Sequence, residues 1–293
     1  MPFAQDLTVD PERLVRQCRW LLTQQVGIAV FGTNSEANSL SVEEKIDLLD
    51  RLVEAGIDPI RLLPGTGLCA LTDTVKLTRH VADLGCSGAL VLPPFYYKGV
   101  TDEGLYRSYA EVIERVGNER LRIYLYHIPP VSQIGISIAL IERLLATYPD
   151  VIAGIKDSSG DWRNTKAMLD AGWDDFRIFA GSESFLLQTM RSGGAGCISA
   201  TANINPAGIH DLYHNWQSPA AAAAQQELIT LRELVQGFPV IPALKSIVFH
   251  YSGDAEWLRV RPPLVELAED QQNDLIGKLE TMGFRMPGLA GNA

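Results

Sequence analysis

The segment VIAGIKDSSGD, residues 151–161, joins a short apolar run to a lysine and then to a polar turn. The apolar run is typical of a buried strand, and Asp161 is placed to cap a helix after the turn. Lys156, at the strand end, would be partly withdrawn from water, which favours the neutral, nucleophilic amine. The segment therefore indicates Schiff-base chemistry, or else a lysine that simply extends from a strand end to solvent.

The unit of strand, polar loop and helix recurs along the chain. Six further apolar runs occur, at residues 27–31, 59–63, 87–92, 122–126, 176–180 and 196–200. Strands that are apolar throughout, and do not alternate with polar residues, indicate a parallel sheet that is covered on both faces. The pattern predicts an α/β fold, the TIM (β/α)8 barrel, in which the loops after the strands carry the chemistry.

The predicted barrel lacks one strand. A closed barrel of this type needs eight strands, whereas the apolar runs give seven, and the first helical pattern, at about residues 11–25, precedes them all. We expect the first strand to be absent or truncated, which would leave unpaired strand edges. After residue 215 the patterns become helical only, at residues 219–236, 241–251 and 263–282. The sequence thus predicts a barrel over 1–215 and a C-terminal helical extension over 216–293.

The composition is that of an ordinary globular protein, with 46% hydrophobic and 20% charged residues and a net charge of −10. The negative charge argues against nucleic acid or an anionic membrane as a partner, while small anionic substrates stay possible. The four cysteines form no C-x-x-C pair, which argues against a zinc knuckle or a disulfide framework. No apolar run approaches the roughly 18 residues that span a bilayer, and no signal-peptide pattern opens the chain. We expect a cytoplasmic protein.

Period-two alternation defines the face on which Lys156 lies. It places Gly154 and Lys156 on one face of their strand and Asp157 on the other. In the neighbouring strand it allows Tyr126 to lie beside Lys156, where a phenol can relay protons during imine formation. Tyr126 could equally be an aromatic side chain that fills the barrel interior.

A second candidate element is the loop GTNSE, residues 32–36. Its backbone N–H groups, the Thr33 hydroxyl and the Asn34 amide lie near a helix start, as expected of a cradle for a carboxylate, with Gly32 at its entrance. Clusters of this kind are also common in ordinary loops and helix caps.

Three segments together resemble one family, the pyruvate-dependent class I aldolases that include dihydrodipicolinate synthase and N-acetylneuraminate lyase. GTNSE at 32–36 resembles the family's G-[TS]-T-G-E loop, YHIP at 126–129 resembles its Y-x-x-P element, and GIKDS at 154–158 resembles its G-[IF]-K-[DE]-[ST] element. Their order, each at the end of a predicted strand, is more specific than any one segment. Residues 94–97 and 193–199 are similar to family elements too.

The resemblance implies a role for each candidate residue. Lys156 would form a Schiff base with the keto carbon of pyruvate or another 2-keto acid, and Tyr126 would be the central proton relay. Thr33 would bind the substrate carboxylate or link the relay, and the backbone of Ile198 would line the pyruvate pocket. Tyr96 would complete the relay of a neighbouring subunit in a homodimer or in a homotetramer of two dimers. The resemblance implies no metal and no separate cofactor.

Departures from the family pattern bear on the second substrate. Asn34 and Ser35 replace a threonine and a glycine of the cradle. Residues 130–135 contain no arginine, although the synthase of the family usually carries one there to pair a substrate carboxylate. Ser182 and Glu183 could bind sugar-acid hydroxyls, or cap a helix. We therefore expect a lyase acting on pyruvate or a 2-keto-3-deoxy acid, with 4-hydroxy-tetrahydrodipicolinate synthase and a non-catalytic keto-acid-binding paralogue as alternatives.

Three other sites are conceivable. His210 and His214, spaced i, i+4, could share a metal, although no third ligand is evident. The glycine-rich residues 193–196 could cradle a phosphate, although no basic residue follows. Lys156 could hold pyridoxal phosphate, but no phosphate cup or partner for the ring nitrogen is apparent.

Overall fold

The computed structural model describes residues 1–289, and these separate into two units. The first unit comprises Met1–Ile28, Gly32–Ile57 and the chain from residue 199 onward; the second comprises Ala29–Phe31 and Asp58–Ile198. The last four residues of the predicted C-terminal extension, 290–293, lie outside the described part. The predicted division near residue 215 stays a prediction.

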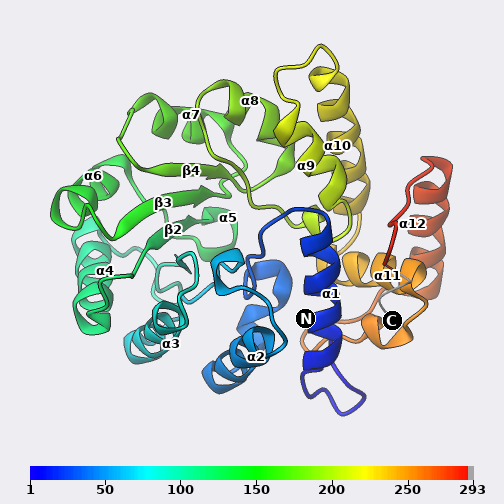
Figure 1. Cartoon of the computed structure of the whole chain (residues 1–293), viewed down its shortest axis with the longest axis horizontal. Coiled ribbons are helices and arrows are strands. Elements are labelled where there is room, and N and C mark those ends of the chain that lie inside the picture. Colours follow the sequence, from blue (N-terminus) through cyan, green and yellow to red (C-terminus); the bar gives the residue numbers. More distant parts are fainter. Residues whose placement is uncertain (290–293) are drawn as a thin grey trace. The chain divides into compact units, whose positions relative to one another are not determined.

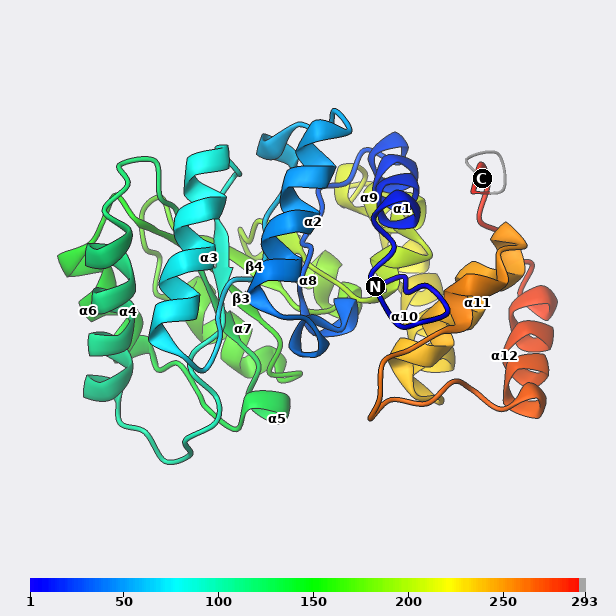
Figure 2. The same cartoon turned by 90° about the horizontal axis from the view of Figure 1, so that it is seen from below.

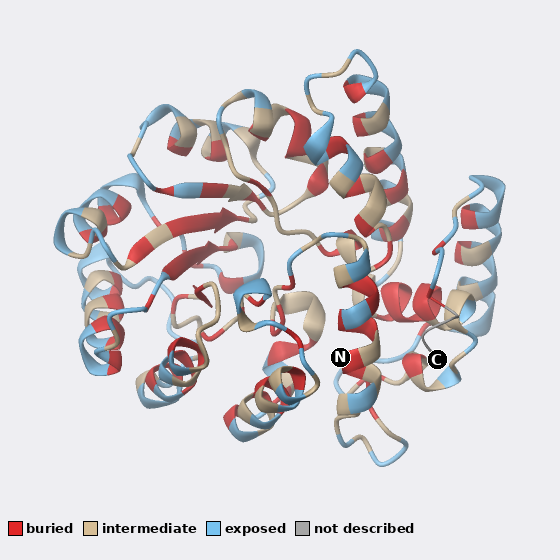
Figure 3. Ribbon diagram, in the orientation of Figure 1, coloured by how far each residue is buried: buried red, intermediate tan, exposed pale blue. Residues whose placement is uncertain are grey.

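The second unit is built on a parallel sheet whose strands follow one another in chain order, β1 to β5. The strands are β1 (Ala89–Val91), β2 (Ile123–His127), β3 (Ile152–Asp157), β4 (Arg177–Ala180) and β5 (Gly196–Cys197). β2 and β3 are buried along almost their whole length (Figure 3), as their apolar sequences predict. The hydrogen bonds of the sheet continue on the other side of β1, where the N–H of Thr66 donates to the backbone oxygen of Leu90 over 3.0 Å.

Two predicted strands are not formed as strands. Residues 59–61 are the 3₁₀ helix η3 (Pro59–Arg61), because the Asp58 side chain accepts the N–H of Ile60 and Pro59 suits a first helical position. Residues 27–31 turn at Phe31, whose φ of 61° interrupts an extended run. Val30 still accepts the N–H of Gly65 over 2.8 Å, so the sheet's hydrogen bonding continues there without a regular strand.

The segment before the first helix forms no sheet strand in the described residues. It contains a single antiparallel bridge between Phe3 and Val9.

Five helices of the second unit lie on the outer side of the sheet (Figure 1). They are α3 (Leu71–Leu84), α4 (Asp102–Val116), α6 (Ile138–Thr147), α7 (Trp162–Asp170) and α8 (Leu186–Arg191), whereas the short α5 (Pro129–Ser132) follows the end of β2. Side-chain caps fix several starts: Ser137 accepts the N–H of Leu140, and Asp161 accepts the N–H of Arg163, as predicted for Asp161. Figure 2 shows α3, α4 and α6 side by side. The alternation of parallel strand and helix is confirmed for this unit.

The first unit is mainly helical. Its helices are α1 (Pro11–Thr23), α2 (Val42–Glu54), α9 (Pro206–His214), α10 (Ala221–Gln236), α11 (Val240–Ser252) and α12 (Glu269–Thr281). Asp10 caps α1, and Ser41 with Glu44 forms a capping box at the start of α2. One apolar cluster, with Trp20, Val235, Ile247 and Leu275 among its buried members, joins α1, α10, α11 and α12.

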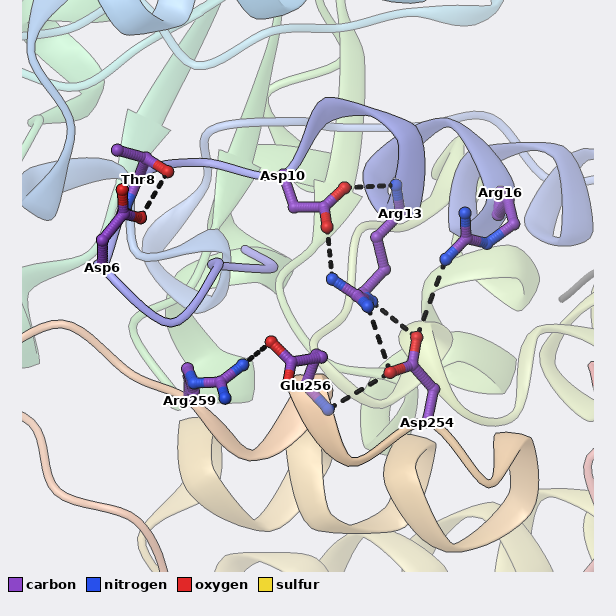
Figure 4. A network of polar contacts seen from close by, with 8 residues as sticks. All are labelled: Asp6, Thr8, Asp10, Arg13, Arg16, Asp254, Glu256 and Arg259. Carbon is purple, nitrogen blue, oxygen red and sulfur yellow. Dashed lines mark hydrogen bonds and ion pairs between the residues drawn. The ribbon is translucent and has the colours of Figure 1, made fainter.

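A polar network ties the start of α1 to the turn after α11 (Figure 4). The guanidinium of Arg13 pairs with Asp254, with Nε 2.5 Å from Oδ2, and also with Asp10. The side chain of Asp254 accepts the N–H of Glu256 as well. Two segments that are distant in sequence are thereby joined within one unit. Each helix in the described residues is too short or too polar to cross a membrane.

Candidate active site

Lys156 and Tyr126 lie side by side on neighbouring strands. β2 and β3 are parallel, and their register pairs Tyr126 with Lys156. The Lys156 Nζ donates to the Tyr126 hydroxyl over 3.1 Å and lies 4.2 Å from the centre of the tyrosine ring. Both residues are buried, with 6% and 4% of their surfaces exposed. The structure therefore places the two predicted residues in direct contact, out of bulk water.

The surroundings of this contact are apolar and closely packed. Tyr126 belongs to a cluster with Leu90, Tyr124 and Ile128. The ring of Tyr124 lies over Gly154: a Cβ at residue 154 would be 2.8 Å from that ring and 2.3 Å from a backbone oxygen of β4. Glycine is therefore required two residues before the lysine, because any larger side chain would collide with the neighbouring strand and ring.

Tyr96 occupies an exposed loop after β1. Its surface is 74% exposed, and its ring meets that of Tyr97 edge to face at 5.4 Å between centres. The ammonium of Lys98 holds this loop to the one after β2, donating to the backbone oxygen of Phe95 and, over 2.8 Å, to that of Ser132. The Tyr96 ring thus lies on the surface of the chain, in a loop that the hydrogen bonds of Lys98 hold in place.

Residues after β4 and β5 have mixed roles. The Ser182 hydroxyl accepts the N–H of Ser184 over 3.1 Å and so caps η4 (Glu183–Phe185), one of the two roles considered from the sequence. Glu183 is buried, with 1% exposed. The N–H of Ile198 donates to the oxygen of Ala180 over 2.9 Å, which extends the β4–β5 pairing by one residue.

The predicted cradle belongs to the first unit. Gly32 precedes the 3₁₀ turn η1 (Thr33–Ser35), in which Thr33 and Asn34 are half-buried. Glu36 follows in the left-handed region with φ of 56°, and its carboxylate Oε1 lies 2.5 Å from the Nζ of Lys245. Both of these side chains are almost fully buried, with 0% and 5% exposed. A buried ion pair therefore fixes the end of the turn.

Sequence reasoning missed a polar pair on the opposite face of β2 and β3. His127 and Asp157 are register partners, each one residue beyond Tyr126 and Lys156. The Nε2 of His127 lies 3.9 Å from Oδ1 of Asp157, and both residues are buried. Burial lowers the pKa of His127, and the nearby Asp157 carboxylate only partly opposes this. The alternation that paired Tyr126 with Lys156 contained the signal, because it also pairs the residues that follow.

No group of three or more His, Cys, Asp or Glu side chains within residues 1–289 is arranged to hold a metal ion. His210 and His214 do meet on α9, with ring centres 4.3 Å apart. Without a third ligand in this part of the chain, their contact is that of two neighbours on a helix face.

Comparisons with known proteins identify the family. The family model described as Dihydrodipicolinate synthetase family matches residues 1–282. An uncharacterized DapA-like lyase from Chloroflexus aurantiacus is 34% identical over 92% of this chain and 90% of its own. The 4-hydroxy-tetrahydrodipicolinate synthase of Methanococcoides burtonii is 30% identical over 96% of this chain and 95% of its own.

Solved structures show the same architecture. The dihydrodipicolinate synthase from Agrobacterium tumefaciens superposes with a TM-score of 0.87 at 30% identity, covering 96% of both chains. A variant of the 2-keto-3-deoxygluconate aldolase of Sulfolobus solfataricus gives a TM-score of 0.85 at 20% identity, covering 96% of this chain and 93% of its own, and that likeness concerns the fold alone. The predicted α/β TIM-barrel class is confirmed. With a buried lysine against a tyrosine at the strand ends, and a family match across residues 1–282, the chain belongs to the dihydrodipicolinate synthetase family, whose members are lyases of the class I aldolase type.

Proposed function

We propose that this chain is a Schiff-base-forming lyase that acts on pyruvate or a 2-keto-3-deoxy acid, by aldol cleavage or condensation or by dehydration. The observation that carries the proposal is the 3.1 Å contact between the Lys156 amine and the Tyr126 hydroxyl in a buried setting. A primary amine in apolar surroundings is a nucleophile toward a ketone, and a phenol beside it can move protons.

The first half of the reaction forms the imine. The Lys156 nitrogen adds to the keto carbon, and the carbonyl oxygen leaves as water, taking one proton from the amine and a second from a general acid. Tyr126 is placed to be that acid, because its hydroxyl is within hydrogen-bond reach of the reacting nitrogen. The product is an iminium ion that draws electrons from the neighbouring carbon.

The second half breaks a bond beta to the imine carbon. In aldol cleavage the electrons of the C3–C4 bond flow to the iminium and give an enamine, while the C4 hydroxyl loses its proton and becomes an aldehyde. Protonation of the enamine carbon and hydrolysis then return the free lysine and pyruvate. Tyr126 can accept and return these protons from one position, and a group so placed typically contributes 10²–10⁴-fold to the rate.

Substrate binding is assigned on the family resemblance. Gly32, Thr33 and Asn34 are proposed to bind the substrate carboxylate; the turn η1 supports this, since such a turn directs backbone N–H groups to one side. The backbone of Ile198 is proposed to line the pyruvate pocket. Ser182 and Glu183 are proposed to contact the remainder of the substrate.

Tyr96 is proposed to act across a subunit interface. A tyrosine with 74% of its surface exposed, on a fastened loop, is suited to enter a neighbouring molecule. We propose a homodimer or a homotetramer of two dimers in the cytoplasm, with no nucleic-acid or membrane partner. Sedimentation of the purified protein tests the oligomeric state. The variant Tyr96→Ala should lower the activity of the oligomer without changing the contacts around Lys156 within each chain.

A second candidate function is the 4-hydroxy-tetrahydrodipicolinate synthase reaction of pyruvate with aspartate semialdehyde. Relatives that carry this name are 26–30% identical over 87–97% of the chain, which favours it. The absence of an arginine from residues 130–135 disfavours it, since a carboxylate-bearing aldehyde would lack that bidentate partner. Steady-state turnover of aspartate semialdehyde, compared with a panel of sugar-acid aldehydes, separates the two.

The covalent step is tested by borohydride reduction in the presence of pyruvate, followed by mass spectrometry of the peptides. We expect the mass of reduced pyruvate on Lys156 and none on Lys166, a surface lysine paired with Asp170. Lys156→Met should abolish both the adduct and turnover. An unmodified Lys156 in the native protein would reject the Schiff base, and an adduct without turnover of any aldehyde would favour the non-catalytic keto-acid-binding paralogue.

A further inference from the structure

His127 and Asp157, the buried polar pair on the opposite face of β2 and β3 from Tyr126 and Lys156, form hydrogen bonds to the two loops that follow these strands. We propose that His127 and Asp157 are positioning residues of the reaction, which hold these loops and so hold Tyr126 against Lys156. This inference rests on the proposed function for its catalytic consequence, whereas its structural part can be measured independently.

His127 fastens the loop after β2. Its Nδ1 accepts the backbone N–H of Ile136, nine residues further along, over 2.9 Å. Within this loop the Ser132 hydroxyl donates to the oxygen of Ile128 over 3.0 Å and accepts the N–H of Ile134 over 3.2 Å. The loop is therefore closed on itself and bound at its far end to the last residue of β2.

The hydrogen bond from Ile136 also defines the state of the ring. Because Nδ1 accepts, a neutral imidazole carries its proton on Nε2, the nitrogen that faces Asp157. The charged group that faces the ring is Asp157, from β3, while the loop presents uncharged backbone at Ile136 and Gly135. A second proton would have to enter at Nδ1 and would break the bond to Ile136.

Asp157 fastens the loop after β3. Its Oδ1 accepts the N–H of Ser159 over 2.9 Å, and its Oδ2 accepts from Asn164 over 3.0 Å and from the Thr165 hydroxyl over 2.7 Å. Asn164 and Thr165 lie in the first turn of α7, so one buried carboxylate joins the strand, the turn and the helix. Three donors to a fully buried carboxylate are an arrangement that a neutral side chain cannot reproduce.

His127 and Asp157 are each joined by one peptide bond to a residue of the proposed reaction, so the loop contacts affect the positions of Tyr126 and Lys156. Tyr126 precedes His127 and Lys156 precedes Asp157, and the backbone N–H of Ser158 donates to the oxygen of His127 over 2.7 Å. Loosening either loop would let the two strand ends shift against each other. A misplacement of about 1 Å between reacting groups can cost on the order of 10²-fold in rate.

The test compares His127→Leu with His127→Asn. Asparagine can offer Oδ1 near the position of Nδ1 and accept the Ile136 N–H, although it cannot titrate, whereas leucine can do neither. We expect His127→Leu to lower kcat about 10- to 100-fold with little change in the KM for pyruvate. His127→Asn should restore kcat to within about fivefold of the native value. As the pH is lowered, kcat should fall less in this variant than in the native chain, because asparagine cannot be protonated. His214→Asn, a histidine change on the exposed face of α9, is the matched control and should match the native profile.

Hydrogen exchange supplies a readout that does not need catalysis. The amides of residues 128–136 should exchange faster in His127→Leu than in the native chain or in His127→Asn. Native kcat in a folded His127→Leu, or an acid limb in His127→Asn identical to the native one, would overturn the catalytic consequence. Unchanged exchange in His127→Leu would overturn the structural part. If that variant does not fold, the His127→Asn pH profile alone decides. A native protein that forms no pyruvate adduct would instead reject the proposed function and leave the exchange result to decide the role of His127.

Discussion

Removing the amine of Lys245 should be among the most destabilising single changes in the first unit. Its Nζ lies 2.5 Å from the carboxylate of Glu36, and the side chains are 5% and 0% exposed. The same amine donates to the backbone oxygen of Arg259 and lies 4.7 Å from the ring centre of Phe3. Burial lowers the pKa of Lys245, and the Glu36 carboxylate opposes this. The N-terminal amine of Met1 also lies 3.4 Å from the Glu36 carboxylate, but burial lowers the pKa of that amine to about 5, so Lys245 is the main counter-charge of Glu36 near neutral pH.

The magnitude follows from that burial. Deleting one partner of a buried ion pair costs about 3–5 kcal/mol, because the remaining charge stays buried without its counter-charge. We therefore expect Lys245→Met to lower stability by about 3 kcal/mol or more, and the double variant Glu36→Gln with Lys245→Met to cost much less than the two single changes added together. Lys278→Met is the control: its pair with Asp274 spans 2.7 Å but is more than 50% exposed on both sides, so about 0.5 kcal/mol or less should be lost.

The assay is thermal unfolding followed by circular dichroism, at fixed protein concentration because assembly also shifts the midpoint. With a shift of roughly 2–4 °C per kcal/mol, Lys245→Met should lower Tm by about 6 °C or more. A Tm within 1–2 °C of the native value, or single changes that simply add in the double variant, would refute the reasoning.

Three further predictions concern the second unit and use the same preparations. Tyr126→Phe should lower kcat by about 10²–10⁴-fold, since it removes the proton relay and keeps the ring; Tyr148→Phe, on the surface, should not, and native kcat in Tyr126→Phe would contradict the relay. Gly154→Ala should cost about 1–3 kcal/mol or more, because its methyl would lie 2.3 Å from a backbone oxygen, while Gly277→Ala, with open space around it, should cost nothing; equal Tm values for the two would contradict the packing argument. Because burial lowers the folded-state pKa of His127 below 6.5, the unfolded chain binds more protons between that lowered value and 6.5, so stability should fall as the pH drops through this window. The fall in Tm from pH 7.5 to 5.5 should be smaller in His127→Asn, and an identical fall would show that His127 does not contribute.

Much of the local structure follows from the sequence. The first helix begins at Pro11, as its pattern predicts, and Ser41 with Glu44 caps α2 through contacts only three residues apart, because caps depend on residues within a few positions of each other. The apolar runs around Tyr126 and Lys156 are strands, as their local sequences predict. Period-two alternation along each strand placed the two side chains on one face. Short-range periodicity is sufficient for such features.

Other features needed the tertiary structure. The apolar run at 59–63 begins as a 3₁₀ turn, because the Asp58 cap outweighs strand propensity at a site where neighbouring backbone still supplies the sheet's hydrogen bonds. The exposure of Tyr96 and the capping role of Ser182 likewise depend on how their loops are folded.

The sequence by itself determined the fold class, the helix starts and the pairing of Lys156 with Tyr126, since each depends on period, capping or motif order. Only the tertiary structure decided that His127 and Asp157 close the loops behind that pair and that Glu36 meets Lys245. The physical reason is that a buried polar group must find its partner wherever the folded chain brings one, and that partner can be distant in sequence.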